Sequence, residues 1–165
     1  MTMPTYPLME VLEVKKRRVE KQEKIVAEKR EVLEREEKKL KELEEARDKV
    51  LQHRNDKLQQ LREELDGGTT TDKIKQMKFY LEDVKEKLAV EEKKVAEQEE
   101  QVEVAKKDLE AALEELRRRR NDVDKLKTHR QDWEKEMRKE MQVIEGREED
   151  ELGQIIFLKN LRERN

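Results

Sequence analysis

The second half of the chain repeats an apolar residue at every seventh position, and this spacing restricts the fold more than any other feature. One series comprises Ile74, Leu81, Leu88, Val95, Val102, Leu109, Leu116, Val123, Met137 and Ile144, with an interruption at Arg130. Three residues after each member lies a second series: Met77, Val84, Glu91, Gln98, Ala105, Ala112, Arg119, Leu126, Trp133 and Glu140. This spacing is the seam of a coiled coil. Because the second series is small or polar in its middle, it predicts one partner helix rather than several.

The first half of the chain carries a similar repeat and can supply that partner. Its members are Leu12, Val19, Val26, Leu33 and Leu40. After a step of eleven residues the repeat resumes at Leu51, Leu58 and Leu65. Such a step is a stutter, and it predicts a local unwinding of the supercoil after Leu40.

The two halves are joined by the stretch LDGGTTTDKI, residues 65–74. Gly67 and Gly68 accept the positive φ angles that end many helices. A threonine among residues 69–71 can cap the next helix, and Asp72 is favourable in its first turn. We therefore predict a turn at residues 67–71.

A reversal at this turn aligns the two repeats. Facing residues then have numbers that sum to about 135, so that Leu33 meets Val102 and Leu12 meets Val123. The predicted fold is all-α, with two long helices that form an antiparallel coiled-coil hairpin. Its expected parts are a lead at residues 1–7, helices at 8–66 and 72–145, and a C-terminal partner-binding tail at 146–165.

The composition agrees with a helical rod and disagrees with a compact globular domain. Half of the residues are charged, and only 33% are hydrophobic. The 43 acidic and 40 basic residues are interleaved and leave a net charge of −3, which favours helix over disorder. There is no cysteine, no apolar run of the ~20 residues that a membrane span needs, and no secretory signal pattern at the N-terminus. These features predict a soluble, cytoplasmic protein.

Nothing in the sequence forms a catalytic or metal-binding constellation. His53 and His129 each lack a second ligand at suitable spacing, so we expect both on the solvated surface. The carboxylates fall on exposed helix faces, and the turn lacks the glycine–lysine spacing of a phosphate-binding loop. We therefore expect no enzyme activity, no cofactor and no metal.

Two basic runs fall at the same level of the predicted hairpin. They consist of Lys15, Lys16, Arg17 and Arg18 in the first helix, and of Arg117, Arg118, Arg119 and Arg120 in the second. One interpretation is a collar neutralised by pairs such as Glu115 with Arg119 and Arg118 with Asp122. The other is a docking band for an acidic partner surface. Nucleic acid is excluded as the expected partner, because the chain is net acidic and has no groove-reading motif.

The apolar pattern continues beyond the predicted overlap of the two helices. Trp133 and Met137 lie on this stripe, and two alternatives remain open for Trp133: a core contact with a folded-back N-terminus around Tyr6 and Leu8, or an anchor for a partner. Gly146, an acidic run and Gly153 predict fraying of the tail. The tail also carries four large apolar residues expected to bind a partner: Leu152, Ile155, Ile156 and Leu158.

Several segments resemble the FliJ/YscO family. The N-terminal stretch YPLMEVLEVKKRRVEKQEKIVAEK resembles the signature of the family. The LDGGTT turn, the QMKFYL start of the second helix, the late tryptophan and the terminal DELGQ are similar to chlamydial YscO-like proteins. The resemblance covers essentially the whole chain.

The resemblance implies a role in type III secretion or flagellar export. Members are small cytoplasmic proteins, similar in shape to the paired helices of the rotary ATPase gamma subunit. They occupy the centre of the hexameric export ATPase, contact the cytoplasmic ring of the export gate and in some cases carry secretion chaperones, so they reach the inner membrane only through partners. By this analogy the termini enter the ATPase and the turn points toward the gate. An export chaperone and a scaffold or homodimer rod are the alternatives; the glycine turn and the register disfavour a parallel homodimer.

Overall fold

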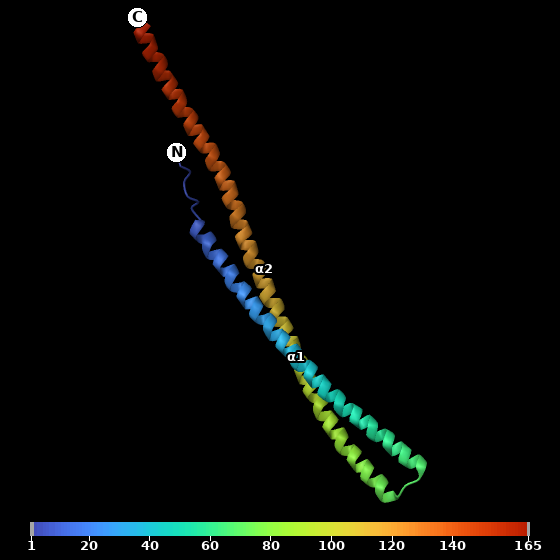
Figure 1. Ribbon diagram of the computed structural model, residues 1–165. Helices are drawn as coiled ribbons and strands as arrows, with labels where there is room; N and C mark the ends of the chain where they lie inside the picture. The colour runs from blue at the N-terminus through green and yellow to red at the C-terminus, as the bar shows by residue number, and fades with distance from the viewer. Residues whose placement is uncertain (1, 165) are drawn as a thin grey trace. The chain divides into compact units, whose positions relative to one another are not determined.

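The computed structural model describes residues 2–164 and contains two long α-helices. Helix α1 spans Met9–Gly67 and helix α2 spans Thr71–Arg164 (Figure 1). The described residues include no strand. The predicted all-α hairpin of two helices is therefore confirmed.

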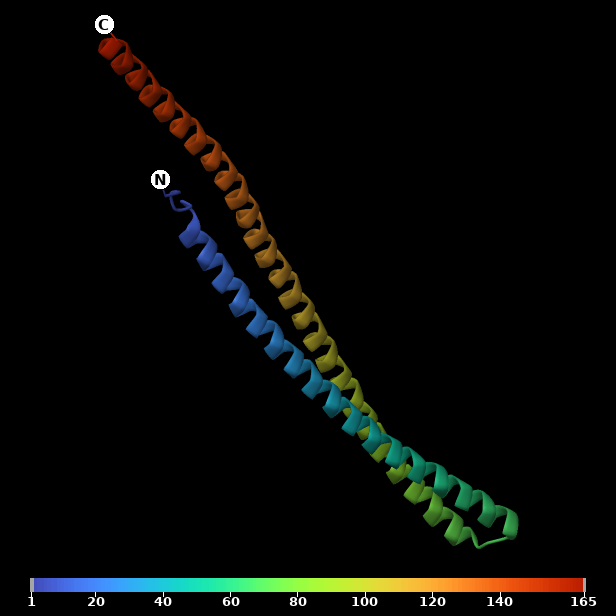
Figure 2. The ribbon, with the colours of Figure 1, turned by 45° about the horizontal axis from the view of Figure 1, so that its top comes forward.

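The chain divides into two compact units, each containing a stretch of both helices. The first unit combines residues up to Gln22 with those from Glu115 onward, and the second comprises Glu23–Glu114 and includes the turn. In the second unit, the views in Figure 1 and Figure 2 both show α1 and α2 running side by side in opposite directions. None of the described helices has a segment long and apolar enough to cross a membrane.

In the second unit, the predicted seam of α2 is buried. Its buried members are Val84, Leu88, Val95, Val102, Ala105 and Ala112. Opposite them on α1, Val26 is buried and Leu33 is half-buried. The side-chain nitrogen of Gln98 donates to the carbonyl oxygen of Glu36 at 3.0 Å across the seam. These two residue numbers sum to 134, which agrees with the register predicted from the sequence.

In the first unit, the same seam continues with apolar residues on both helices. Leu12 of α1 is almost completely buried, as are Leu116 and Val123 of α2. Gln22 is also buried, and it interacts with another residue of the chain. The contacts between α1 and α2 in this unit join residues such as Lys15 and Asp122, whose numbers sum to 137.

The predicted stutter after Leu40 is wrong. On α1 the half-buried positions continue at unbroken seven-residue spacing, through Arg47, Val50, Arg54, Lys57, Leu61 and Glu64. Of the three leucines that the stutter would have turned inward, Leu51 and Leu65 are 37% and 51% exposed, and Leu58 is half-buried. The seam of α2 opposite keeps its seven-residue repeat, so α1 stays in phase with it. The aliphatic stems of arginine and lysine can cover apolar neighbours while their charged ends reach solvent.

The turn is formed by Gly68 and two threonines. Gly68 has φ of 81°, whereas Gly67 is the last residue of α1. Thr70 is the N-cap of α2, because its side-chain oxygen accepts a hydrogen bond from the backbone N–H of Lys73 at 3.3 Å. The ammonium group of Lys73 lies 3.1 Å from a carboxylate oxygen of Glu64, which links the two helices beside the turn.

Helix α2 does not end at residue 145, where we predicted its end. It continues through Gly146 and Gly153 to Arg164, and every described residue after 146 is exposed. A glycine in a helix costs about 1 kcal/mol relative to alanine, which the surrounding glutamate, arginine and leucine residues offset. Arg162 and Arg164 also favour the C-terminal end of the helix dipole.

The backbone at Gly68 gives a direct test of the turn. Gly68→Ala places a Cβ on a residue with positive φ, so we expect a loss of about 1–2 kcal/mol of unfolding free energy. Gly67→Ala is the matched control, because Gly67 is helical and a Cβ there meets nothing within 4 Å. Urea unfolding followed by circular dichroism measures both. Equal stability of the two variants would contradict the turn.

Candidate functional site

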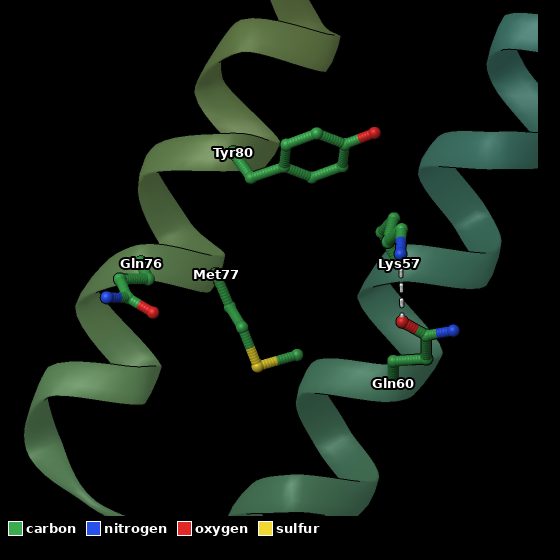
Figure 3. A pocket seen from close by; sticks show the side chains of 5 residues that line it. All are labelled: Lys57, Gln60, Gln76, Met77 and Tyr80. Carbon is green, nitrogen blue, oxygen red and sulfur yellow. Dashed lines mark hydrogen bonds between the residues drawn. The ribbon is translucent and has the colours of Figure 1, made fainter.

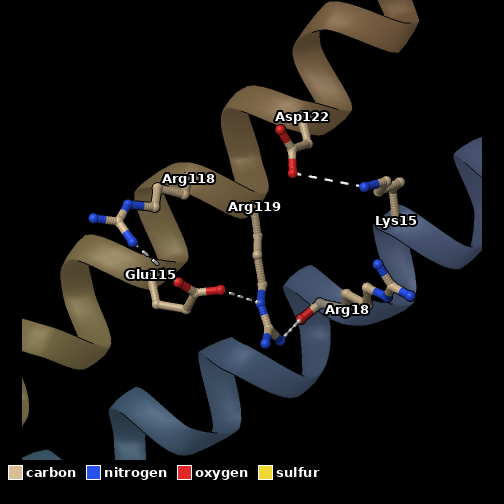
Figure 4. A network of polar contacts seen from close by, with 6 residues as sticks. All are labelled: Lys15, Arg18, Glu115, Arg118, Arg119 and Asp122. Carbon is tan, nitrogen blue, oxygen red and sulfur yellow. Dashed lines mark hydrogen bonds and ion pairs between the residues drawn. The ribbon is translucent and has the colours of Figure 1, made fainter.

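The two basic runs lie side by side in the first unit, and we call them together the basic collar (Lys15–Arg18 and Arg117–Arg120). Figure 4 shows the contacts that join them. The guanidinium of Arg119 donates to the backbone carbonyl of Arg18 at 3.1 Å. The ammonium of Lys15 lies 3.7 Å from a carboxylate oxygen of Asp122. The register predicted from the sequence is therefore correct in bringing the two runs to the same level of the hairpin.

Acidic side chains partly neutralise the basic collar. Glu115 accepts a hydrogen bond from Nε of Arg119 at 3.0 Å, as the sequence predicted, and its other oxygen lies 3.8 Å from Arg118 (Figure 4). Asp122 was expected to pair with Arg118 along the helix, and the structure places it beside Lys15 on the other helix. Exposed pairs of this kind contribute at most ~1 kcal/mol each. The side chain of Arg118 remains 68% exposed, so the collar still presents positive charge to solvent.

The N-terminal lead is held against α2 by an aromatic clasp, which consists of Tyr6, His129 and Trp133. Tyr6 is only 4% exposed, and its ring centroid lies 5.4 Å from that of Trp133 and 5.7 Å from that of His129. The hydroxyl group of Tyr6 and Nδ1 of His129 share a hydrogen bond. The structure therefore shows the first of our two alternatives for Trp133, the core contact with the folded-back N-terminus.

Both histidines are exposed, as predicted, but each is bonded to a tyrosine that we did not foresee. Nε2 of His53 lies 2.7 Å from the hydroxyl oxygen of Tyr80, whereas His129 uses Nδ1 for its hydrogen bond with Tyr6. The residue numbers of these pairs sum to 133 and 135. The hairpin register was therefore the signal that could have identified both pairs.

Close to the turn, a small cavity open to solvent lies between the two helices. Its volume is about 240 Å³, and Figure 3 shows the side chains around it: Lys57, Gln60, Gln76, Met77 and Tyr80. The ammonium of Lys57 lies 5.5 Å from the centre of the Tyr80 ring, a cation–π arrangement. Phe79, the residue before Tyr80 on α2, is 81% exposed. Phe79 was not among the residues predicted to bind a partner, although an exposed aromatic is typical of a protein contact.

The C-terminal part of α2 presents a second apolar surface. The predicted residues Leu152, Ile155, Ile156 and Leu158 are all more than half exposed, and so is Phe157, which we missed. Met137 is half-buried and lies nearer to the clasp. This segment belongs to the first unit, whereas Phe79 and the cavity belong to the second. Their roles in partner binding remain predictions.

The geometry of these surfaces suits protein contacts. Among residues 2–164, no group of three histidine, cysteine or acidic side chains is arranged to hold a metal ion. The cavity near the turn offers a thioether, amides, an ammonium and a phenol, which supply contact area and hydrogen bonds. Groups of these kinds can contact a protein partner.

Removing the ring of Tyr6 should release the lead and uncover Trp133. We expect Tyr6→Ala to shift the emission of Trp133, the one tryptophan of the chain, to longer wavelength, because water then reaches the indole. The matched control is Tyr80→Ala, which removes a tyrosine of the other unit. Steady-state fluorescence measures both. An unchanged Tyr6→Ala spectrum would contradict the clasp.

The comparisons with known proteins agree with this architecture. A solved structure of a YscO homolog, CT670, from Chlamydia trachomatis is 47% identical, covers 99% of each chain and has a TM-score of 0.92. A chain in the structure of the CdsV and CdsO protein complex of Chlamydia pneumoniae is 50% identical, and the match covers 51% of this chain and 98% of that one, with a TM-score of 0.50. No curated protein matches the sequence.

The family is shown by a match to almost the entire sequence. The family model described as YscO-like protein matches residues 3–163, which include both helices and the turn. The chain therefore belongs to the YscO-like family of type III secretion proteins.

Proposed function

We propose that this chain is a non-enzymatic coupling protein of a type III secretion export apparatus, which links the hexameric export ATPase to the cytoplasmic ring of the export gate. The observation that carries the proposal is the match of the whole hairpin to a YscO homolog, at a TM-score of 0.92 over 99% of both chains. The YscO-like family consists of secretion structural or adaptor proteins rather than enzymes. In this proposal the protein is cytoplasmic and reaches the inner membrane only through its partners.

The arrangement of the helices supports a coupling role. Each helix uses its seam to bind the other, so the residues left for partners lie mainly outside the seam. They belong to the basic collar, apart from Lys15 and Arg119, to the exposed C-terminal segment and to the surface near the turn. The first two belong to the unit that holds both termini, and the third belongs to the unit that holds the turn. Separate units with separate surfaces can bind two partners at once.

We assign the unit that holds both termini to the ATPase. Its basic collar offers charge to an acidic partner, and its C-terminal helix offers large apolar side chains such as Ile155 and Phe157. We assign the unit that holds the turn to the gate ring, with Phe79 as the apolar anchor. A related chain occurs in the structure of the CdsV and CdsO protein complex, two type III secretion components, which supports assembly with such a partner.

A second candidate function is escort of secretion chaperones. The exposed apolar residues of the C-terminal segment favour it, because such a surface can hold a partner helix. The two functions predict different bound proteins. Retention of a chaperone without ATPase or gate ring would favour the escort role and contradict the coupling role.

Neutralising the collar should weaken binding to the ATPase. We expect a variant with Lys15, Lys16, Arg17 and Arg18 changed to glutamine to bind the purified export ATPase about tenfold more weakly at low salt, because charge complementarity is lost. Light scattering and ATP turnover, each with and without the protein, report hexamer assembly and stimulation.

The control variant removes four exposed cations from α1 in the other unit, with glutamine at residues 35, 38, 41 and 49. Circular dichroism verifies that both variants remain helical. If the two variants bind the ATPase equally well, the collar is not the docking band.

Truncating Phe79 should affect the other partner. We expect Phe79→Ala to weaken binding to the purified cytoplasmic domain of the export gate by tenfold or more, which is about the effect of losing a buried aromatic anchor. Val90→Ala is the control, because Val90 is also exposed on α2 in the same unit. Calorimetry measures both affinities. Unchanged binding of Phe79→Ala to the gate would refute this anchor without affecting the assignment of the collar.

A further inference from the structure

Between Leu40 and the turn, α1 carries two possible seams and uses one of them. The seam in use includes Val50, Lys57 and Glu64, all half-buried. Immediately after each of these residues comes a leucine: Leu51, Leu58 and Leu65. Leu51 and Leu65 are exposed and Leu58 is half-buried, whereas Lys57 and Glu64 occupy the interface with Val50.

A small rotation of α1 exchanges the two sets. In a seven-residue repeat, the series of Arg54 and Leu61 lies between the series of Lys57 and the series of Leu58 around the helix axis. Turning α1 by about 50°, one-seventh of a full turn, keeps Arg54 and Leu61 in the interface. The same rotation brings the three leucines inward and moves Val50, Lys57 and Glu64 outward.

Opposing interactions act on the two arrangements. Burial of three leucines in place of one valine and two charged residues favours the rotated arrangement. The described arrangement is favoured by the Lys57 contact with the Tyr80 ring and by the Glu64–Lys73 ion pair. Both of these polar contacts lie near solvent, where such interactions are weak.

The sequence also provides a place to absorb the rotation. Val26 and Leu33 fix α1 against α2 on the far side of Leu40 from the turn. The step of eleven residues from Leu40 to Leu51 is the spacing that a coiled coil accommodates by local unwinding. The seam of α2 keeps its seven-residue repeat opposite this region, with Val84 and Leu88 buried, and can pack against either face of α1.

We propose that α1 exchanges between two rotational phases from Leu40 to the turn: the described phase, with Lys57 and Glu64 at the interface, and a rotated phase, with Leu51 and Leu65 there. In the rotated phase, Leu51, Leu58 and Leu65 therefore pack against α2 itself. The exchange is a property of the hairpin alone and does not depend on the proposed function. A partner that contacts both helices here meets a different surface in each phase, so its binding shifts their populations.

Distances between spin labels on the outer faces of the helices distinguish the phases. The chain contains no cysteine, so labels can be attached at Asn55→Cys and Glu82→Cys, which are exposed residues at the same level of the second unit. A 50° rotation moves a label at the helix surface by about 5 Å. We expect two distance populations in the otherwise unchanged chain.

Two variants should move these populations in opposite directions. The double variant Lys57→Leu, Glu64→Leu makes the described seam apolar and should retain only the distance of the described phase. Val50→Gln removes the valine of that seam and should enrich the distance of the rotated phase by about tenfold. Circular dichroism verifies that both remain helical. Identical single distances in all three proteins would overturn the proposal.

The comparison remains decisive if Val50→Gln fails to fold. A second distance in the unchanged chain that disappears in the Lys57→Leu, Glu64→Leu variant supports two phases. A distribution that is the same in these two proteins overturns them.

Discussion

Pairing of the unbroken seven-residue seam of α2 with α1 is the interaction on which the rest of the structure depends. The chain has few apolar residues, and nearly all that are buried lie on this one stripe. The register of the pairing brings the two basic runs together in the first unit and brings His53 to Tyr80 in the second. Each candidate surface therefore follows from one alignment of two helices.

The sequence predicted this alignment because periodicity and the glycine turn act over long stretches. The sequence could not predict which face of α1 packs against α2 near the turn, because Leu51, Leu58 and Leu65 form a more apolar stripe than the residues that occupy the interface. The end of α2 was predicted too early because Gly146 and Gly153 were treated as helix breaks. The helix-forming residues around them keep the segment helical. The tyrosine–histidine pairs were missed because each residue was considered alone.

Membership of the YscO-like family and the physical character of the chain lead to the same kind of function. A two-helix interface that satisfies its own seams leaves charged and apolar surfaces at separate places, and these are suited to holding partners together. The polar residues in the seam near the turn lower the stability of that stretch relative to the apolar seam around Leu12 and Val123. Adaptability is therefore concentrated in the unit that we assign to the export gate.

The charged seam beside the turn also affects how the hairpin folds. Contacts next to a turn close the shortest loops and have the smallest entropic cost. In this chain those contacts join α2 to Lys57 and Glu64, which contribute little hydrophobic burial. On α2 the buried residues closest to the turn are Val84 and Leu88, whereas the buried valine of α1 closest to the turn is Val26, whose contacts close longer loops. We therefore expect the hairpin to fold more slowly than its helical content alone would suggest.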